Sequence, residues 1–347
     1  MCNIAGYVGE KRAAPILIEM LKKQEFLDGG LGTGIATIHE GKLYSAKVIG
    51  SVDTLLKETD ALNFPGNIGI IHSRPDDNFI EYIHPFVSEE GKTAIVENGN
   101  MCGDEGVRNR IKEVIDLLLE NGYVFESAHD LGPKHPYPPL PDGRRISFIE
   151  LHAKYIEHLR KTTDMSYPEA FSKSTSDIFA DEVSVMVTAN TPENIYVSRV
   201  TRPMNIMKKK DGCYLATSQL AFPDWQEAEY IKSLPHMATS TITKDGFEVS
   251  PYPITTGNVI DFTEEEYNNI KEEIRKKLEK EPLALDSLGG GIFVRNTSPD
   301  KFRPNAKASY DALWELFKEG VLERYDEMSE FSWMPGKKVM KTFFYLK

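Results

Sequence analysis

The order of the elements that the sequence predicts is typical of a layered α+β fold that extends to about Phe262. Short apolar runs with a two-residue period come first, amphipathic helices follow, and a second group of strands closes the region. A chain of 347 residues is long enough to bury a full-size core. Beyond Phe262 we expect a small α/β appendage, so the predicted domains are residues 2–262 and 263–347.

The first 100 residues predict mainly strands. Ile4, Gly6 and Val8 lie on one side of a two-residue period, which indicates a buried first strand. A helical apolar pattern follows over residues 13–21, and residues 34–50 form a hairpin pattern that turns at Glu40-Gly41. Two further apolar runs, residues 67–74 and 92–100, end in polar residues. We therefore expect these two strands to deliver functional side chains at their C-terminal ends.

The middle of the chain alternates helices with a loop rich in proline. Apolar stripes predict helices over residues 107–118 and 148–159. Between them, residues 131–145 contain five prolines and two glycines, which excludes a helix or a central strand and predicts an ordered loop or a lid. Later apolar runs predict strands at residues 183–189, 194–200, 213–218 and 247–252.

Composition narrows the classes of function. A formal charge of −12 argues against general affinity for nucleic acid or an anionic membrane, and no apolar run is long enough for a spanning helix. Three widely spaced cysteines predict neither a disulfide framework nor a zinc motif. The eight histidines are scattered, so no metal site and no organic cofactor are expected. We expect a cytoplasmic protein without a membrane partner.

Cys2 is a candidate nucleophile because a small second residue allows removal of Met1. Its thiol would then share one residue with a free α-amine. Because the amine titrates near pH 8, it can accept the thiol proton close to neutral pH. The alternative is a small hydrophobic residue in the first strand, and position alone favours that alternative.

Four further positions offer groups suited to amide chemistry on an amino acid. Asn98 and Gly99 offer an amide and an unobstructed backbone N–H for an oxyanion, although Asn-Gly is also a common turn. Arg74 offers a bidentate partner for an α-carboxylate. Asp130 offers an anion for an α-ammonium group. A surface ion pair or a helix cap is the alternative for each of these two charged residues.

Taken together, these motifs resemble the glutaminase domain of class II glutamine amidotransferases, most closely that of the glutamine:fructose-6-phosphate aminotransferase family. The matching segments are CNIAGYVG, GTGIAT, GIIHSR, His84-Pro85, ENGN and GYVFESAHD, in the family's order. TRPMNI and LATSQLAF are weaker matches. The resemblance covers roughly residues 2–260 and is most specific in the first 130.

The resemblance implies a four-layer α/β/β/α N-terminal nucleophile hydrolase fold and hydrolysis of L-glutamine to glutamate and ammonia through a thioester. It assigns Cys2 as nucleophile, Asn98 and Gly99 as oxyanion hole, and Arg74 and Asp130 as the glutamine clamp. Two departures stand out. Residues 75–78, Pro-Asp-Asp-Asn, replace the family's substrate-covering loop, and the family's sugar isomerase domains have no counterpart here.

Three functions remain open. The favoured one is a glutaminase that acts alone or supplies ammonia to a separate synthase. The second is hydrolysis of another amide in a different acyl pocket. The third is a catalytically silent protein that binds an amino acid or a partner. The tail, with two helices and a basic hairpin, resembles a winged-helix-like module. Because its first helix is acidic, we favour a packing or oligomerisation role over phosphate contacts by Lys337, Lys338 and Lys341.

Overall fold

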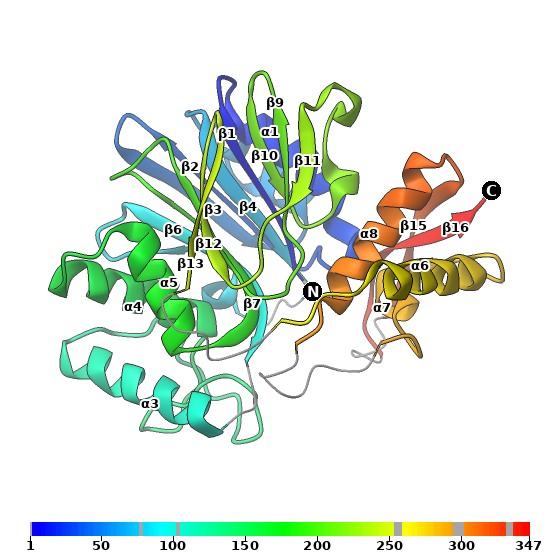
Figure 1. Cartoon of the computed structure of the whole chain (residues 1–347). Coiled ribbons are helices and arrows are strands. Elements are labelled where there is room, and N and C mark those ends of the chain that lie inside the picture. Colours follow the sequence, from blue (N-terminus) through cyan, green and yellow to red (C-terminus); the bar gives the residue numbers. More distant parts are fainter. Residues whose placement is uncertain (1, 76–78, 102–104, 253–258, 294–301, 331–335) are drawn as a thin grey trace.

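The computed structural model describes residues 2–75, 79–101, 105–252, 259–293, 302–330 and 336–347 (Figure 1). Two antiparallel sheets stack at its centre, and helices cover their outer faces. The space between the sheets is filled by aliphatic side chains from both, including Ile4, Val96 and Val183. The predicted four-layer α/β/β/α sandwich is confirmed.

The first sheet has the strand order β11-β9-β10-β1-β4-β2-β3, which places the N-terminal strand at its centre. Its strands are β1 (Asn3–Gly9), β2 (Gly32–His39), β3 (Lys42–Ile49), β4 (Ile68–Arg74), β9 (Asn205–Lys209), β10 (Gly212–Ala216) and β11 (Tyr230–Ser233). Helices α1 (Ala13–Lys22) and α2 (Val52–Glu58) pack on its outer face, because their apolar stripes contact the outward residues of β1, β2 and β4.

The second sheet has the order β13-β12-β8-β7-β6-β5. Its strands are β5 (Phe86–Val87), β6 (Thr93–Met101), β7 (Ala180–Thr188), β8 (Ile195–Arg199), β12 (Ala238–Thr243) and β13 (Gly246–Pro251). The helices on its outer side are α3 (Glu105–Glu120), α4 (Phe148–Thr162) and α5 (Tyr167–Asp177). Strand β6 therefore has one face toward the sandwich interior and the other toward α4.

The C-terminal residues form a third group of elements beside the two sheets (Figure 1). They comprise α6 (Glu264–Leu278), β14 (Leu283–Ala284), α7 (Leu285–Leu288), α8 (Asn305–Lys318), β15 (Leu322–Glu330) and β16 (Lys338–Leu346). Thr263 and Glu266 make the reciprocal capping bonds that start α6. Lys341 is buried and pairs with Asp286 at 2.9 Å, so its ammonium group is not presented to an external phosphate.

No described helix combines the length and the apolar character that crossing a bilayer requires.

Candidate active site at the start of the first strand

Cys2 and Asn98 meet where the two sheets come together. The backbone nitrogen of Cys2 donates a hydrogen bond to Oδ1 of Asn98 at 3.1 Å. Asn98 is 3 % exposed, and its Nδ2 has no hydrogen-bond partner among the described residues. Because Oδ1 is engaged by Cys2, the amide presents an unused donor beside the proposed nucleophile.

Asn98 and Gly99 lie inside β6 rather than in a turn. They pair with Val183 and Glu182 of β7 in an unbroken antiparallel register. A Cβ atom on Gly99 would lie 2.7 Å from the Cβ of Glu182, closer than side chains approach one another. Glycine is therefore required here by the neighbouring strand, and the turn alternative for this dipeptide is wrong.

Two neutral histidines hold the backbone of Glu97, the residue before Asn98. Nε2 of His72 donates to the Glu97 carbonyl oxygen at 3.0 Å, and Nδ1 of His84 accepts from the Glu97 N–H at 3.1 Å. Burial, with a contribution from the charge of Arg74, lowers the pKa of His72 to about 3. Burial also lowers the pKa of His84 well below its ordinary value. Both rings stay uncharged and fix the strand that carries Asn98.

Strand β1 is held at its first residues by the segment after β10. The Ile4 N–H donates to Oγ1 of Thr217 at 3.0 Å, and Nε2 of Gln24 donates to the Ile4 carbonyl oxygen at 3.0 Å. Oε1 of Gln24 in turn accepts from the N–H of Ser218 at 3.0 Å. These bonds give Cys2 a fixed position. Thr217 and Ser218 belong to the LATSQLAF segment, so this segment helps to position the start of β1.

Arg74 ends β4 and is 7 % exposed. Its guanidinium donates to the carbonyl oxygen of Tyr82 and to the hydroxyl of Tyr137, the latter at 3.2 Å. Tyr137 belongs to the proline-rich segment, whose path is fixed by Arg145 bonds to the carbonyl oxygens of Tyr137 and Pro133 at 3.0 and 2.7 Å. The predicted ordered loop is thus present, and it covers Arg74.

Asp130 lies at the exposed start of the same loop. Its carboxylate accepts a hydrogen bond from the backbone N–H of Gly132 at 3.1 Å. The neighbouring His129 stacks on Phe79 at a centroid separation of 3.9 Å and lies edge-on to Tyr82 at 5.5 Å. Asp130 therefore directly follows a residue that packs against Tyr82, a hydrogen-bond partner of Arg74. The role of Asp130 as the ammonium partner remains a prediction.

Tyr310 is a buried residue of the C-terminal elements that no sequence motif indicates. It comes from α8, is 1 % exposed, and its hydroxyl has no hydrogen-bond partner among the described residues. Burial raises the pKa of Tyr310, and the nearby charge of Cys2 raises it further. A helix of the C-terminal appendage therefore carries a buried polar group that interacts electrostatically with Cys2. The sequence does not indicate a functional role for Tyr310, because a tyrosine in an amphipathic helix normally indicates only packing.

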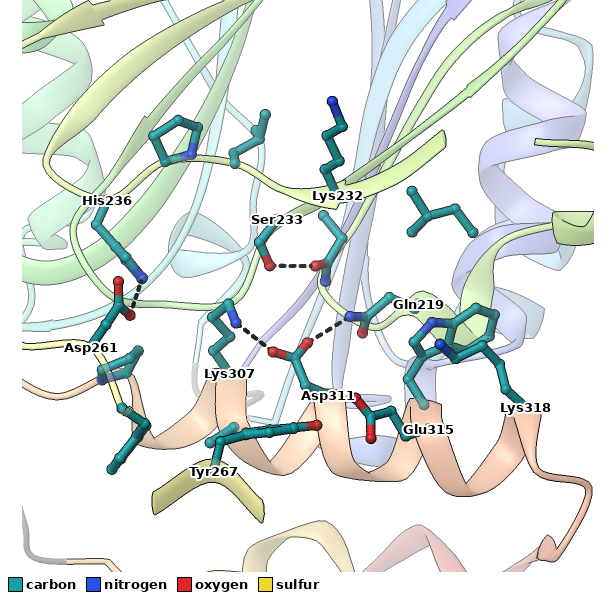
Figure 2. A pocket seen from close by; sticks show the side chains of 18 residues that line it. Gln219, Lys232, Ser233, His236, Asp261, Tyr267, Lys307, Asp311, Glu315 and Lys318 are labelled. Atoms are coloured by element: carbon teal, nitrogen blue, oxygen red, sulfur yellow. Dashed lines mark hydrogen bonds and ion pairs between the residues drawn. The ribbon is translucent and has the colours of Figure 1, made fainter. Parts of the chain in front are cut away.

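The same helix also lines a cavity of about 650 Å³ between the appendage and the strand β11 region (Figure 2). Lys307 and Asp311 of α8 form an ion pair at 2.5 Å at its floor, and Asp311 also accepts from Gln219 at 2.7 Å. Lys232, Ser233 and His236 face the cavity from the other side. Helix α8 thus supplies one wall of this mixed-charge cavity.

Comparisons with known proteins agree with this geometry. The chain is 31 % identical over 228 residues to glutamine–fructose-6-phosphate aminotransferase [isomerizing] of Pyrococcus horikoshii, a match that spans 64 % of this chain and 33 % of the relative. The protein of the same name from Thermococcus kodakarensis is 26 % identical over 267 residues, or 75 % of this chain and 39 % of that one. The chain thus spans little more than a third of these relatives' length. No protein-family model matches it.

Solved structures share the fold. The glutamine phosphoribosylpyrophosphate amidotransferase from B. subtilis, complexed with ADP and GMP, superposes with a TM-score of 0.60 at 16 % identity, over 93 % of this chain and 66 % of that one. A structure described as the allosteric regulatory enzyme of purine biosynthesis also gives 0.60, at 16 % identity, over 90 % and 63 % of the two chains. These likenesses establish the architecture of the sandwich.

Proposed function

We propose that this chain is a class II glutamine amidotransferase and that it releases ammonia from L-glutamine through a thioester on Cys2, on the support of its likeness to the glutamine–fructose-6-phosphate aminotransferases and of its fold. The contact that carries the proposal joins Cys2 to Asn98, since it sets a nucleophile beside an unused buried amide donor.

The first step is attack by the Cys2 sulfur on the side-chain amide carbon of glutamine. Removal of Met1 converts the Cys2 nitrogen into an α-amine, which accepts the thiol proton. The hydrogen bond from this nitrogen to Asn98 then holds the base in place. Nucleophile and base come from one residue, so no separate catalytic histidine is required.

Asn98 and Gly99 stabilise the tetrahedral intermediate. The new S–C bond places negative charge on the former amide oxygen, and Nδ2 of Asn98 and the Gly99 N–H are assigned as its donors. Their position is fixed before the reaction by His72 and His84, which hold the preceding peptide group. Such preorganised donors stabilise the transition state without a cost of rearrangement.

Ammonia leaves when the intermediate collapses. The C–N bond breaks, the α-ammonium of Cys2 returns its proton to the departing nitrogen, and a γ-glutamyl thioester remains. Water, activated by the same amine, then attacks the thioester carbon, and glutamate leaves as the Cys2 thiol is restored. We assign the released ammonia to an acceptor protein or domain, and a separate synthase is our proposed partner.

Arg74 and Asp130 are the proposed partners of the glutamine α-carboxylate and α-ammonium. Support differs for the two residues. Arg74 is buried at the end of β4, whereas Asp130 is exposed and engaged with Gly132. Binding of a carboxylate by Arg74 requires the Tyr137 hydroxyl to share the guanidinium or move aside. This contact favours a second candidate, a hydrolase with a different amide substrate.

A substrate panel separates the two functions. We expect ammonia release from L-glutamine to exceed release from L-asparagine and D-glutamine, and to vanish in Cys2→Ala. A matched control is Cys213→Ala, since Cys213 is a buried thiol in β10 away from the site. Turnover of another amide with no turnover of glutamine would replace glutamine as substrate. If a chain that has lost Met1 turns over no amide, the proposal that this protein is an amidohydrolase is refuted.

A further inference from the structure

Three ionisable side chains meet on the outer face of β6, behind Asn98. They are Glu97 of β6, Glu182 of β7 and His152 of α4, and one ligand atom from each lies within 4.8 Å of the others. His152 and Glu182 are fully buried, and Glu97 is 6 % exposed. Consecutive residues of a strand point to opposite faces, so Glu97 faces α4 while Asn98 faces Cys2.

Most of the polar atoms of this cluster lack a hydrogen bond. Both carboxylate oxygens of Glu182 and both ring nitrogens of His152 are buried without a partner among the described residues. Only Glu97 has one, from the hydroxyl of Ser184 at 3.1 Å. The side chain of Thr175 lies near Glu182, and the backbone of Ile178 lies near His152. Neither contact has the geometry of an ordinary hydrogen bond. Buried polar groups left in this way are costly, and they call for a ligand.

From this arrangement we infer that Glu97, His152 and Glu182 bind one divalent first-row transition-metal ion. Imidazole nitrogen and carboxylate oxygen are ligands that Zn²⁺ and Mn²⁺ accept. Nδ1 of His152 lies 3.6 Å from Oε1 of Glu182 and 3.9 Å from Oε2 of Glu97. Ligands about 2.0–2.2 Å from a tetrahedral ion lie about 3.4 Å apart. The three ligand atoms lie within 4.8 Å of one another here, so the side chains move closer together when they bind the ion.

The charges of the three side chains fit the same ligand. The two carboxyl groups and the imidazole share a buried space with almost no access to solvent. Two carboxylates in such a space are costly unless a cation balances their charge. A divalent ion balances the two negative charges and fills the missing contacts of Glu182 and His152.

The ion has a structural role. It lies on the face of the sheet opposite Cys2, and it joins α4 to the strand segment Glu97-Gly99. Glu182 also packs directly behind Gly99. Metal binding therefore stabilises the strand that carries Asn98, whether or not glutamine is the substrate, so this inference does not depend on the proposed function.

Metal binding is tested on the full-length chain carrying Cys2→Ala, so that the Cys2 thiol cannot hold Zn²⁺. The protein is treated with a chelator, dialysed separately against ZnCl₂, MnCl₂ and MgCl₂, passed through a desalting column and assayed by elemental mass spectrometry. We expect one equivalent of Zn²⁺ or Mn²⁺ per chain, little Mg²⁺, and a higher Tm with the bound ion. Less than a tenth of an equivalent of both transition metals would overturn the inference.

Two substitutions place the ion in the cluster. Glu182→Gln and His152→Gln are expected to weaken binding at least about tenfold and to abolish the metal-dependent rise in Tm. His158→Gln is the matched control, because His158 is a buried histidine of the same helix that packs on Tyr123 instead. Unchanged affinity in Glu182→Gln would assign any bound metal elsewhere and refute the site. If one of these variants fails to fold, the metal content of the chain with the intact cluster still tests the inference.

Discussion

The Cys2 nitrogen donates a hydrogen bond of 3.1 Å to the Asn98 side chain, which joins the central strand of one sheet to a strand of the other. The bond orients the Asn98 amide so that Nδ2 is the donor left for an oxyanion. Asn98→Ala is therefore expected to lower kcat for glutamine by about a hundredfold to a thousandfold with little change in KM. Steady-state kinetics give both constants. An equal rise in KM at constant kcat would assign Asn98 to substrate binding.

Gly99→Ala is expected to remove activity by a steric route. Its Cβ would lie 2.7 Å from the Cβ of Glu182, so β6 or β7 must shift and move the Asn98 donor. We expect a lower Tm and a kcat reduced as strongly as in Asn98→Ala. Gly290→Ala is the control for a general cost of losing a glycine, since an added Cβ there would meet only the Ser287 carbonyl oxygen, at 3.5 Å. Wild-type kcat in Gly99→Ala would show that the register tolerates the shift.

Arg74→Lys tests the carboxylate clamp. Lysine keeps the charge but loses the bidentate geometry, so KM for glutamine should rise about tenfold or more while kcat changes little. Tyr137→Phe removes the hydroxyl that competes for the guanidinium. We expect this second variant to lower KM or leave it unchanged. If neither substitution alters KM for the preferred amide, Arg74 does not bind the substrate.

Tyr310→Phe asks whether the appendage takes part in the site. The Tyr310 hydroxyl has no described hydrogen-bond partner, so its removal should leave Tm unchanged within about 2 °C. A substrate atom in contact with the hydroxyl would lose that bond, and kcat/KM should then fall about tenfold. Tyr252→Phe is the control, since its buried hydroxyl bonds to Ser198 instead. Unchanged kcat/KM in Tyr310→Phe would limit the residue to packing.

Stability should depend on pH through Glu25. Burial raises the pKa of its carboxyl from 4.5 to about 7, although the N–H of Val52 opposes the shift. A raised folded-state pKa favours the protonated form, so this contribution to stability is complete below pH 4.5 and is lost as the pH rises through 7. It is on the order of 3 kcal/mol. Urea unfolding at pH 5 and pH 8 should show a smaller difference for Glu25→Gln than for wild type, and equal differences would exclude this role.

The strand and helix patterns predicted most of the sandwich, because its core side chains are apolar and periodic. Helix α5 was not predicted. Its buried face carries Ser172 and Thr175, which bond to Thr239 and Ser198, so hydrophobic periodicity is absent there. The capping box of Ser166 with Glu169 was the available signal. Strand β12 was missed for the same reason, since Thr239 and Ser240, on its two opposite faces, are both buried and polar.

Site residues were predictable where a motif carries them, as with Cys2, Arg74 and Asn98. Residues that meet only in the folded chain were not. His72 and His84 were recognised as parts of motifs, but their hydrogen bonds to the Glu97 backbone depend on the packing of two sheets. Tyr310 and the Glu97–His152–Glu182 cluster arise from contacts between distant segments. The expectation of no metal site rested on sequence spacing, which cannot detect such a cluster.

The central claim is that Cys2 becomes an N-terminal nucleophile that reacts with glutamine. Intact mass spectrometry before and after incubation with 6-diazo-5-oxo-L-norleucine, a glutamine-mimicking alkylator, tests both parts in one measurement. The account predicts a chain that lacks Met1 and gains one adduct, which is absent in Cys2→Ala. Retention of Met1, or a processed chain that forms no Cys2-dependent adduct, would contradict it.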